Sequence, residues 1–80
     1  MTHIIKILGS GCTKCTTLFN LTKEVVEENH IPATIEKVEQ IDEIMKYHIM
    51  ITPALVLNGE VKVKGRVPSR EELLQLLQSA

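Results

Sequence analysis

Both cysteines of this chain lie in one stretch, Gly9-Ser10-Gly11-Cys12-Thr13-Lys14-Cys15. A short apolar run, Ile4 to Leu8, precedes this stretch, and a segment with helical periodicity follows it. The order predicts a buried strand, a tight glycine turn and then the first turn of a helix. Unpaired N–H groups and a partial positive charge at a helix start stabilise a thiolate placed there. The stretch therefore predicts a reactive pair of thiols.

The two thiols are expected to have different roles. Cys15 shares a helix face with the apolar positions that follow it, whereas Cys12 lies at the exposed tip of the turn. We therefore predict that Cys12 is the nucleophile and that Cys15 resolves the mixed disulfide. Lys14 is expected to add positive charge beside the thiolate, and Gly11 is expected to support the exposed turn.

Metal binding is the main alternative for such a pair. Structural zinc needs four protein ligands, and the chain offers two cysteines with three scattered histidines, His3, His30 and His48. Two thiolates do suit a soft ion such as copper, so a small soft-metal carrier stays open. Inert core thiols are a third possibility, but the glycines around Ser10 favour an exposed turn. We favour redox use and expect no bound metal.

Composition limits the other function classes. The chain has 80 residues, 44% of them hydrophobic, and a net charge of −1 with acids and bases mixed. This balance predicts one small domain, 1–80, with no nucleic-acid surface and no membrane patch. The first residues lack the features of a signal peptide, so we expect a cytoplasmic protein. Thiols stay reduced there, and a close cysteine pair is then more often catalytic than structural.

Periodicity along the chain predicts alternating strands and helices. Strands are expected at 4–8, 33–38, 54–57 and 60–64, and helices at 13–29, from 39 to about 49, and from Ser69 onward. Ser69 with Glu72 forms a capping-box pattern, and Asn58-Gly59 is a strong hairpin signal. Val61 and Val63 are both expected to face inward. The second helix is expected to bury one face, made of Ile41, Ile44, Met45 and His48.

Three motifs occur together at characteristic distances: the cysteine stretch 9–15, Ile51-Thr52-Pro53-Ala54, and Asn58-Gly59-Glu60-Val61 leading to Gly65. With the order β-α-β-α-β-β-α, they make the whole chain resemble the thioredoxin-like superfamily. More narrowly, the chain resembles the small single-domain thioredoxin- or glutaredoxin-like redox proteins. The resemblance implies an α/β fold with three helices and a four-stranded mixed sheet, ordered second, first, third, fourth strand.

The resemblance also implies where a substrate binds. It implies a cis peptide bond between Thr52 and Pro53, facing the cysteines, and a backbone at Thr52 that pairs with an extended substrate. Gly65 falls where thioredoxins keep a glycine close to the site. The chain departs from the family pattern in three ways: Thr13-Lys14 separates the cysteines, no tryptophan precedes Cys12, and Lys6 stands where thioredoxins bury an aspartate. The glutathione-binding pattern of glutaredoxins is also missing after the hairpin.

These observations lead to one functional prediction, a thiol–disulfide oxidoreductase or electron carrier. Cys12 and Cys15 would cycle between dithiol and disulfide, with no bound cofactor. The expected partners are a disulfide-containing protein substrate and, by family resemblance, a thioredoxin-reductase-like flavoprotein. We expect a monomer. The soft-metal chaperone that uses the same Cys-x-x-Cys pair is the alternative, although such carriers usually end in a strand rather than a leucine-rich helix.

Overall fold

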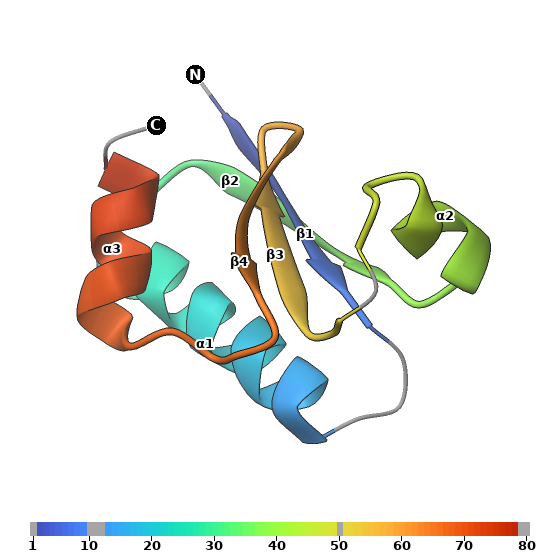
Figure 1. Cartoon of the computed structure of the whole chain (residues 1–80). Coiled ribbons are helices and arrows are strands. Elements are labelled where there is room, and N and C mark those ends of the chain that lie inside the picture. The colour runs from blue at the N-terminus through green and yellow to red at the C-terminus, as the bar shows by residue number, and fades with distance from the viewer. Residues whose placement is uncertain (1, 10–12, 50, 79–80) are drawn as a thin grey trace.

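The computed structural model describes residues 2–9, 13–49 and 51–78. The elements are β1 (His3–Leu8), α1 (Thr13–Glu28), β2 (Ala33–Val38), α2 (Ile41–Met45), β3 (Ala54–Leu57), β4 (Glu60–Lys64) and α3 (Arg70–Gln78) (Figure 1). Each expected strand is present, and β1 begins one residue early. Across the described residues, no helix is long and apolar enough to cross a membrane.

The four strands form one mixed sheet in the order β2-β1-β3-β4. β1 and β2 are parallel and are joined by α1, whereas β3 runs antiparallel to both β1 and β4. A parallel pair needs a long crossover, and a helix of this length supplies it. The predicted fold class and strand order are therefore confirmed.

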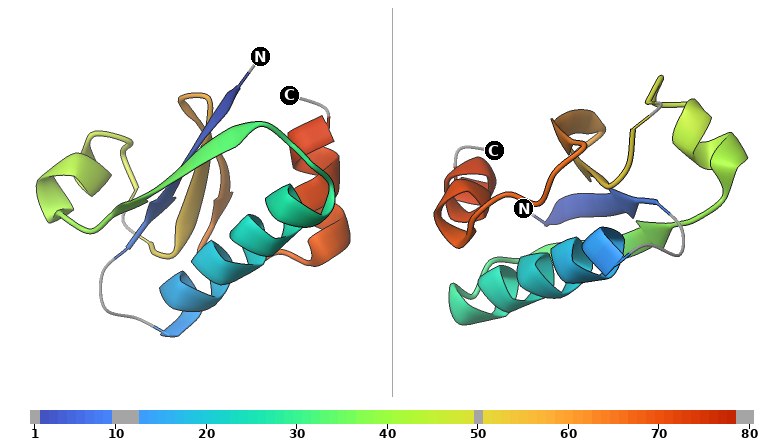
Figure 2. Two further views of the ribbon diagram at one scale, coloured as in Figure 1. Left: turned by 180° about the vertical axis from the view of Figure 1, so that it is seen from behind. Right: turned by 60° about the horizontal axis from the view of Figure 1, so that its bottom comes forward.

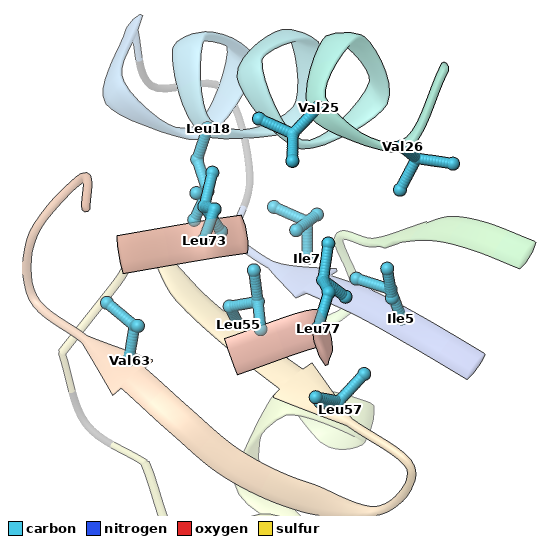
Figure 3. Close-up of a cluster of buried hydrophobic side chains, with 10 residues drawn as sticks. All are labelled: Ile5, Ile7, Leu18, Val25, Val26, Leu55, Leu57, Val63, Leu73 and Leu77. Carbon is cyan, nitrogen blue, oxygen red and sulfur yellow. The ribbon is translucent and has the colours of Figure 1, made fainter. Parts of the chain in front are cut away.

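Side chains on the two faces of the sheet belong to two separate cores. The larger core lies between the sheet and the helices α1 and α3, which pack side by side (Figure 2). It consists of Ile5, Ile7, Leu18, Val25, Val26, Leu55, Leu57, Val63, Leu73 and Leu77 (Figure 3). The smaller core, towards α2, consists of Leu8, Ile44, Ile49, Ala54 and Val56. The sheet is thus covered on both faces although the chain is short.

The long helix α1 ends through its backbone. His30 has a positive φ of 52°, and the N–H of Ile31 donates to the carbonyl of Val26 at 3.0 Å. The N–H of His30 donates to Glu27 at 3.4 Å. These two bonds form a Schellman motif, which satisfies the last carbonyls of the helix and turns the chain back towards β2.

The β3–β4 hairpin contains an irregularity that corrects one prediction. Asn58 and Gly59 both have positive φ, 51° and 88°, as a type I′ turn requires. The register shifts next to this turn, because Leu55 pairs with Val63 but the following Val56 pairs with Val61. Val63 therefore packs into the larger core and Val61 against the smaller one. The two valines do not share the face that simple alternation suggested.

The second helix is shorter than predicted, and its inward face is different. It spans Ile41–Met45, and the chain then turns through His48, which has a φ of 58°. Ile41 and Met45 are 67% and 63% exposed. The residues that contact the smaller core are Ile44, Ile49 and the half-buried Tyr47. The prediction assumed a helical period from 39 to 49. The helix ends at Met45, after about one turn, so the predicted inward face is not formed.

The last helix has the predicted cap in part. The N–H of Glu72 donates to the Ser69 hydroxyl oxygen at 3.2 Å. The Glu72 carboxylate does not return to the backbone, as a full capping box would require, and instead accepts hydrogen bonds from the Arg66 guanidinium. This pairing lowers the pKa of Glu72 below its ordinary value.

Two kinds of contact join α1 to α3, and they should differ in strength. Arg70 pairs with Glu24 at 2.5 Å and with Glu28 at 3.0 Å, but all three side chains are about half exposed. Exposed ion pairs contribute little because water and salt screen them. Leu73 is fully buried between the helices and the sheet.

We expect Leu73→Ala to lower the free energy of unfolding by about 2–5 kcal/mol through lost burial and a cavity. Arg70→Met should lower it by less than about 1 kcal/mol, and this effect should shrink in high salt. Urea unfolding of both variants at low and high salt measures the difference. Equal losses in the two variants would show that the ion pairs, and not the core, hold the helices together.

Candidate active site

Gly9 is the point at which β1, α1 and the loop before β3 come together. Its N–H donates to the carbonyl of Val38 at 2.9 Å, which holds it beside the end of β2. A Cβ on Gly9 would overlap the sulfur of Cys15 and lie 3.3 Å from the Cβ of Thr52. Its φ of +143° is also one that other residues rarely adopt. The missing side chain therefore lets the Cys15 sulfur and Thr52 approach the same piece of backbone.

The loop before β3 is held by a second glycine. The Thr52–Pro53 peptide bond is cis, and the Pro53 carbonyl accepts a hydrogen bond from the Gly65 N–H at 2.8 Å. A Cβ on Gly65 would lie 2.8 Å from a methyl carbon of Ile51. Pro53 is buried, whereas Thr52 and Ile51 are exposed. Gly65 thus lets β4 pack closely against a loop that presents two side chains to solvent.

Of the two cysteines, only Cys15 lies within the described residues. Cys15 lies in the first turn of α1, is 7% exposed and is disulfide-bonded. The other cysteine of the chain, Cys12, lies outside the described residues, as does Gly11. The burial of Cys15 agrees with the inward position expected from the helical period. The nucleophilic role of Cys12 stays a prediction.

Of the two lysines singled out in the sequence, one is exposed to solvent and the other lies on the face of the sheet opposite α1. Lys14 is exposed in the first turn of α1. Lys6 pairs with Val56 across the sheet, and Val56 belongs to the smaller core on the face opposite α1. An interaction with the Tyr47 side chain, aided by Glu36 and Glu43, raises the pKa of Lys6. Lys6 therefore belongs to the α2 side of the molecule and does not reach Cys15.

A small cavity lies beside Cys15, and two of its charged residues were not among the predicted site residues. Its volume is about 20 Å³, and it is lined by Ile7, Gly9, Cys15, Thr16, Lys37 and Glu39. Lys37 and Glu39 come from the end of β2 and its continuation, where alternate residues face α1. The ammonium of Lys37 lies 4.8 Å from the centre of the Phe19 ring on α1. The alternation of side chains along the second strand could have indicated from the sequence that Lys37 and Glu39 lie on the α1 side of the sheet.

Metal-ligating side chains are not grouped in the part of the chain that is described. Within residues 2–9, 13–49 and 51–78, no three His, Cys, Asp or Glu side chains come close enough to hold an ion. The three histidines lie in different places: His3 at the start of β1, His30 after α1, and His48 after α2.

Comparisons with a family model and with known proteins agree on one family. The family model of the thioredoxin domain matches residues 3–78. A thioredoxin of Methanothermobacter thermautotrophicus is 38% identical over 73 residues, covering 91% of this chain and 95% of that protein. A thioredoxin of Methanocaldococcus jannaschii is 36% identical over 76 residues, covering 95% of this chain and 87% of that protein. The resemblance noted from the motifs is therefore confirmed.

Solved structures agree with this match. Thioredoxin-2 of a malaria parasite, described as a component of its protein secretion machinery, superposes with a TM-score of 0.75 over 99% of this chain and 84% of its own. At 17% identity, this likeness shows the fold alone. The solution structure of reduced MJ0307 has a TM-score of 0.58 at 26% identity and covers 96% of this chain and 94% of its own.

Replacement of two glycines by alanine should separate backbone conformation from contact with sulfur. Gly59 also has a positive φ, +88°, but a Cβ there would meet nothing within 4 Å. We expect Gly59→Ala to cost about 1–2 kcal/mol of unfolding free energy, from the left-handed conformation alone. Gly9→Ala should cost about 1–3 kcal/mol more, because the new methyl group overlaps the Cys15 sulfur.

Urea unfolding of the oxidised proteins measures both costs. Gly9→Ala should also slow reaction of the protein with disulfides, since the sulfur must move, whereas Gly59→Ala should leave this rate unchanged. If the two variants lose the same stability and react at the parent rate, the close approach of Gly9 to the sulfur has no consequence.

Proposed function

The chain belongs to the thioredoxin family, and from this premise we propose that it is a thiol–disulfide oxidoreductase that cycles Cys12 and Cys15 between dithiol and disulfide. The observation that supports this most is the convergence at Gly9. The buried Cys15 sulfur and the Cβ of Thr52, the exposed residue before the cis proline, both lie close to the position that a Gly9 side chain would occupy. This closeness supports a site in which a partner polypeptide binds along the loop beside the sulfur.

In the first step, the Cys12 thiolate attacks one sulfur of a disulfide in a partner protein. A mixed disulfide forms between Cys12 and that sulfur, and the other sulfur of the partner leaves as a thiolate. The partner strand lies along Thr52 and forms backbone hydrogen bonds with it. Ile51, which is 58% exposed, provides an apolar contact beside this strand.

In the second step, Cys15 attacks the Cys12 sulfur. The Cys12–Cys15 bond forms, the bond to the partner breaks, and the partner leaves fully reduced. Two electrons have then passed from the protein to the partner. A flavoprotein of the thioredoxin-reductase type returns the protein to its dithiol form. All of this chemistry uses sulfur atoms of the chain and needs no bound cofactor.

A soft-metal carrier that uses the same two cysteines is a different function on the same residues. The matches to thioredoxins give it no support. It also assigns no role to the exposed Thr52, which lies near the Cys15 sulfur at Gly9, or to the cis Pro53 that follows it. We therefore keep the redox function.

Trapping with single-cysteine variants tests the assigned roles. Cys15→Ser should accumulate a mixed disulfide with a disulfide-containing protein such as insulin, because the resolving thiol is missing. Cys12→Ser should accumulate none, because its remaining thiol is buried. Non-reducing electrophoresis and mass spectrometry identify the linked sulfur, and the parent protein with dithiothreitol should reduce insulin catalytically. Trapping by Cys12→Ser, or parent protein that does not reduce insulin, would refute the proposal.

A further inference from the structure

The sheet has two border strands, β2 and β4, and their outer edges differ (Figure 2). An open strand edge is a template for pairing with another chain, and proteins commonly protect it with bulges or charged side chains. β4 is protected in both ways, because its register shifts opposite Leu55 and Val56 and it carries the exposed Lys62 and Lys64. β2 pairs with β1 without a shift over its whole length. β2 therefore presents a regular edge.

The backbone of β2 directs hydrogen-bonding groups out of the sheet. Among the described strands, β2 has β1 as its single neighbour. The carbonyls of Pro32 and Val38 accept hydrogen bonds from the β1 side. Backbone groups alternate in direction along a strand, so the even-numbered residues of β2 bond to β1. The N–H and C=O groups of Ala33, Ile35 and Lys37 therefore point to the open side.

An apolar hollow lies along the same edge. It has a volume of about 380 Å³ and is lined by Phe19, Lys23, Val26 and Glu27 of α1 and by Ala33 and Ile35 of β2. Phe19, Ala33 and Ile35 pack against the larger core but are only partly buried. A chain that pairs with β2 would also cover this hollow, which adds apolar burial to the backbone hydrogen bonds.

Two side chains of the hollow carry opposite charges. Lys23 and Glu27 lie about one helical turn apart, are exposed, and take part in no ion pair within the part of the chain that the structure describes. A two-fold axis that brings two copies of α1 side by side reverses the direction of the second helix. Lys23 of each copy can then face Glu27 of the other. This self-complementary charge favours a second copy of the chain as the occupant of the edge.

The spacing of the layers suits such a pairing. α1 contacts β1 and β2 alike, so its axis lies between them, about half a strand spacing inside the edge. If two β2 strands pair at about 4.8 Å, the two α1 axes lie about 10 Å apart on the same face of the joined sheet. Helices pack against each other at axial distances of about 8–10 Å. Strand pairing and helix packing are therefore compatible.

Helix and strand can be aligned with each other. α1 joins two adjacent parallel strands, so it runs antiparallel to both. The ammonium of Lys37 on β2 lies 4.8 Å from the centre of the Phe19 ring on α1. From this point, four residues of the helix advance about 6 Å, and two residues of the strand advance about 7 Å in the same direction. Lys23 is therefore level with Ile35, and each further helical turn matches two further strand residues.

Charge then selects one register for the two strands. A two-fold axis at Glu36 or Lys37 would place like charges directly opposite each other, which destabilises a strand pair. An axis at Ile35 or Ala33 would bring equal charges of the two α1 helices together. Thr34 is the remaining centre. Its axis falls between the levels of the two charged residues of α1, so opposite charges face each other.

We propose that this chain forms a symmetric dimer through the outer edges of two β2 strands, antiparallel about Thr34, with Lys23 of each copy beside Glu27 of the other. Ala33 of each copy exchanges backbone hydrogen bonds with Ile35 of the other, and the two sheets become one. The two apolar hollows close against each other below the joined strands. This dimer replaces the monomer that we expected from the sequence.

The dimer leaves both candidate active sites open. Gly9 and the Cys15 sulfur lie beyond the end of β2, where the Gly9 N–H donates to the Val38 carbonyl. Because the two β2 strands are antiparallel, these ends point away from each other and from the axis at Thr34. The association therefore goes beyond the proposed redox function and does not depend on it.

Sedimentation equilibrium in dithiothreitol measures the association without intermolecular disulfides. We expect a reversible dimer of the parent protein with a dissociation constant in the micromolar range, since the interface is small. A parent protein that stays monomeric up to about 1 mM would overturn the proposal. An extended peptide of another protein would then be the occupant to test.

Charge reversal tests the orientation of the two copies. Lys23→Glu should weaken the association tenfold or more, because like charges then face each other on both sides of the axis, and Glu27→Lys should do the same. The double variant Lys23→Glu/Glu27→Lys should restore most of the association, since its charges are again opposite. Lys64→Glu makes the same change in net charge on the other border strand, and it should associate like the parent.

Hydrogen exchange locates the interface. The amides of Ala33, Ile35 and Lys37 should exchange more slowly in the parent at high concentration than in Lys23→Glu, whereas the amides of β1 should exchange alike in both proteins. A dimer whose three outward amides exchange rapidly would overturn the proposal, and so would a double variant that does not regain association. Urea unfolding confirms that each variant is folded. Reduction of insulin by Lys23→Glu should match the parent, because the active sites lie outside the interface.

Discussion

The site depends on a glycine at position 9, because any side chain there would overlap the Cys15 sulfur. Gly9 directly follows β1, has a φ of +143°, and leaves room for the Cys15 sulfur and Thr52. A methyl group there would push the sulfur away from the strand end, and with it the first turn of α1. The N–H of Gly9 donates to the Val38 carbonyl, so the glycine that the sulfur approaches is tied to the end of β2. The rest of the site is arranged around this contact.

A second close approach fixes the other half of the site. Gly65 lets β4 lie against Ile51 and donates to the carbonyl of Pro53. The loop before β3 is thereby held on two sides, by Gly9 at Thr52 and by Gly65 at Pro53. Rigid strands can position a short loop precisely. In this chain, Gly9 and Gly65 allow the close approaches because neither has a side chain.

Local patterns predicted most of this arrangement, and the failures have physical causes. The glycine turn, the Thr-Pro strand start and the Asn-Gly hairpin each act over a few residues, so the sequence predicts them well. The bulge that separates Val61 from Val63 depends on pairing with β3 and leaves no local signal. The early end of α2 after Met45 and the cavity at Glu39 arise from tertiary packing, which periodicity cannot describe.

The proposed chemistry requires Cys12 and Cys15 to form one reversible two-electron couple. Equilibration in dithiol–disulfide buffers of stepped potential, followed by alkylation and intact mass, measures this couple directly. We expect a single transition between unmodified and doubly alkylated protein, with the slope of a two-electron couple and a midpoint above about −300 mV. A singly alkylated species at equilibrium, or a disulfide that resists reduction well below that potential, would refute the two-cysteine couple.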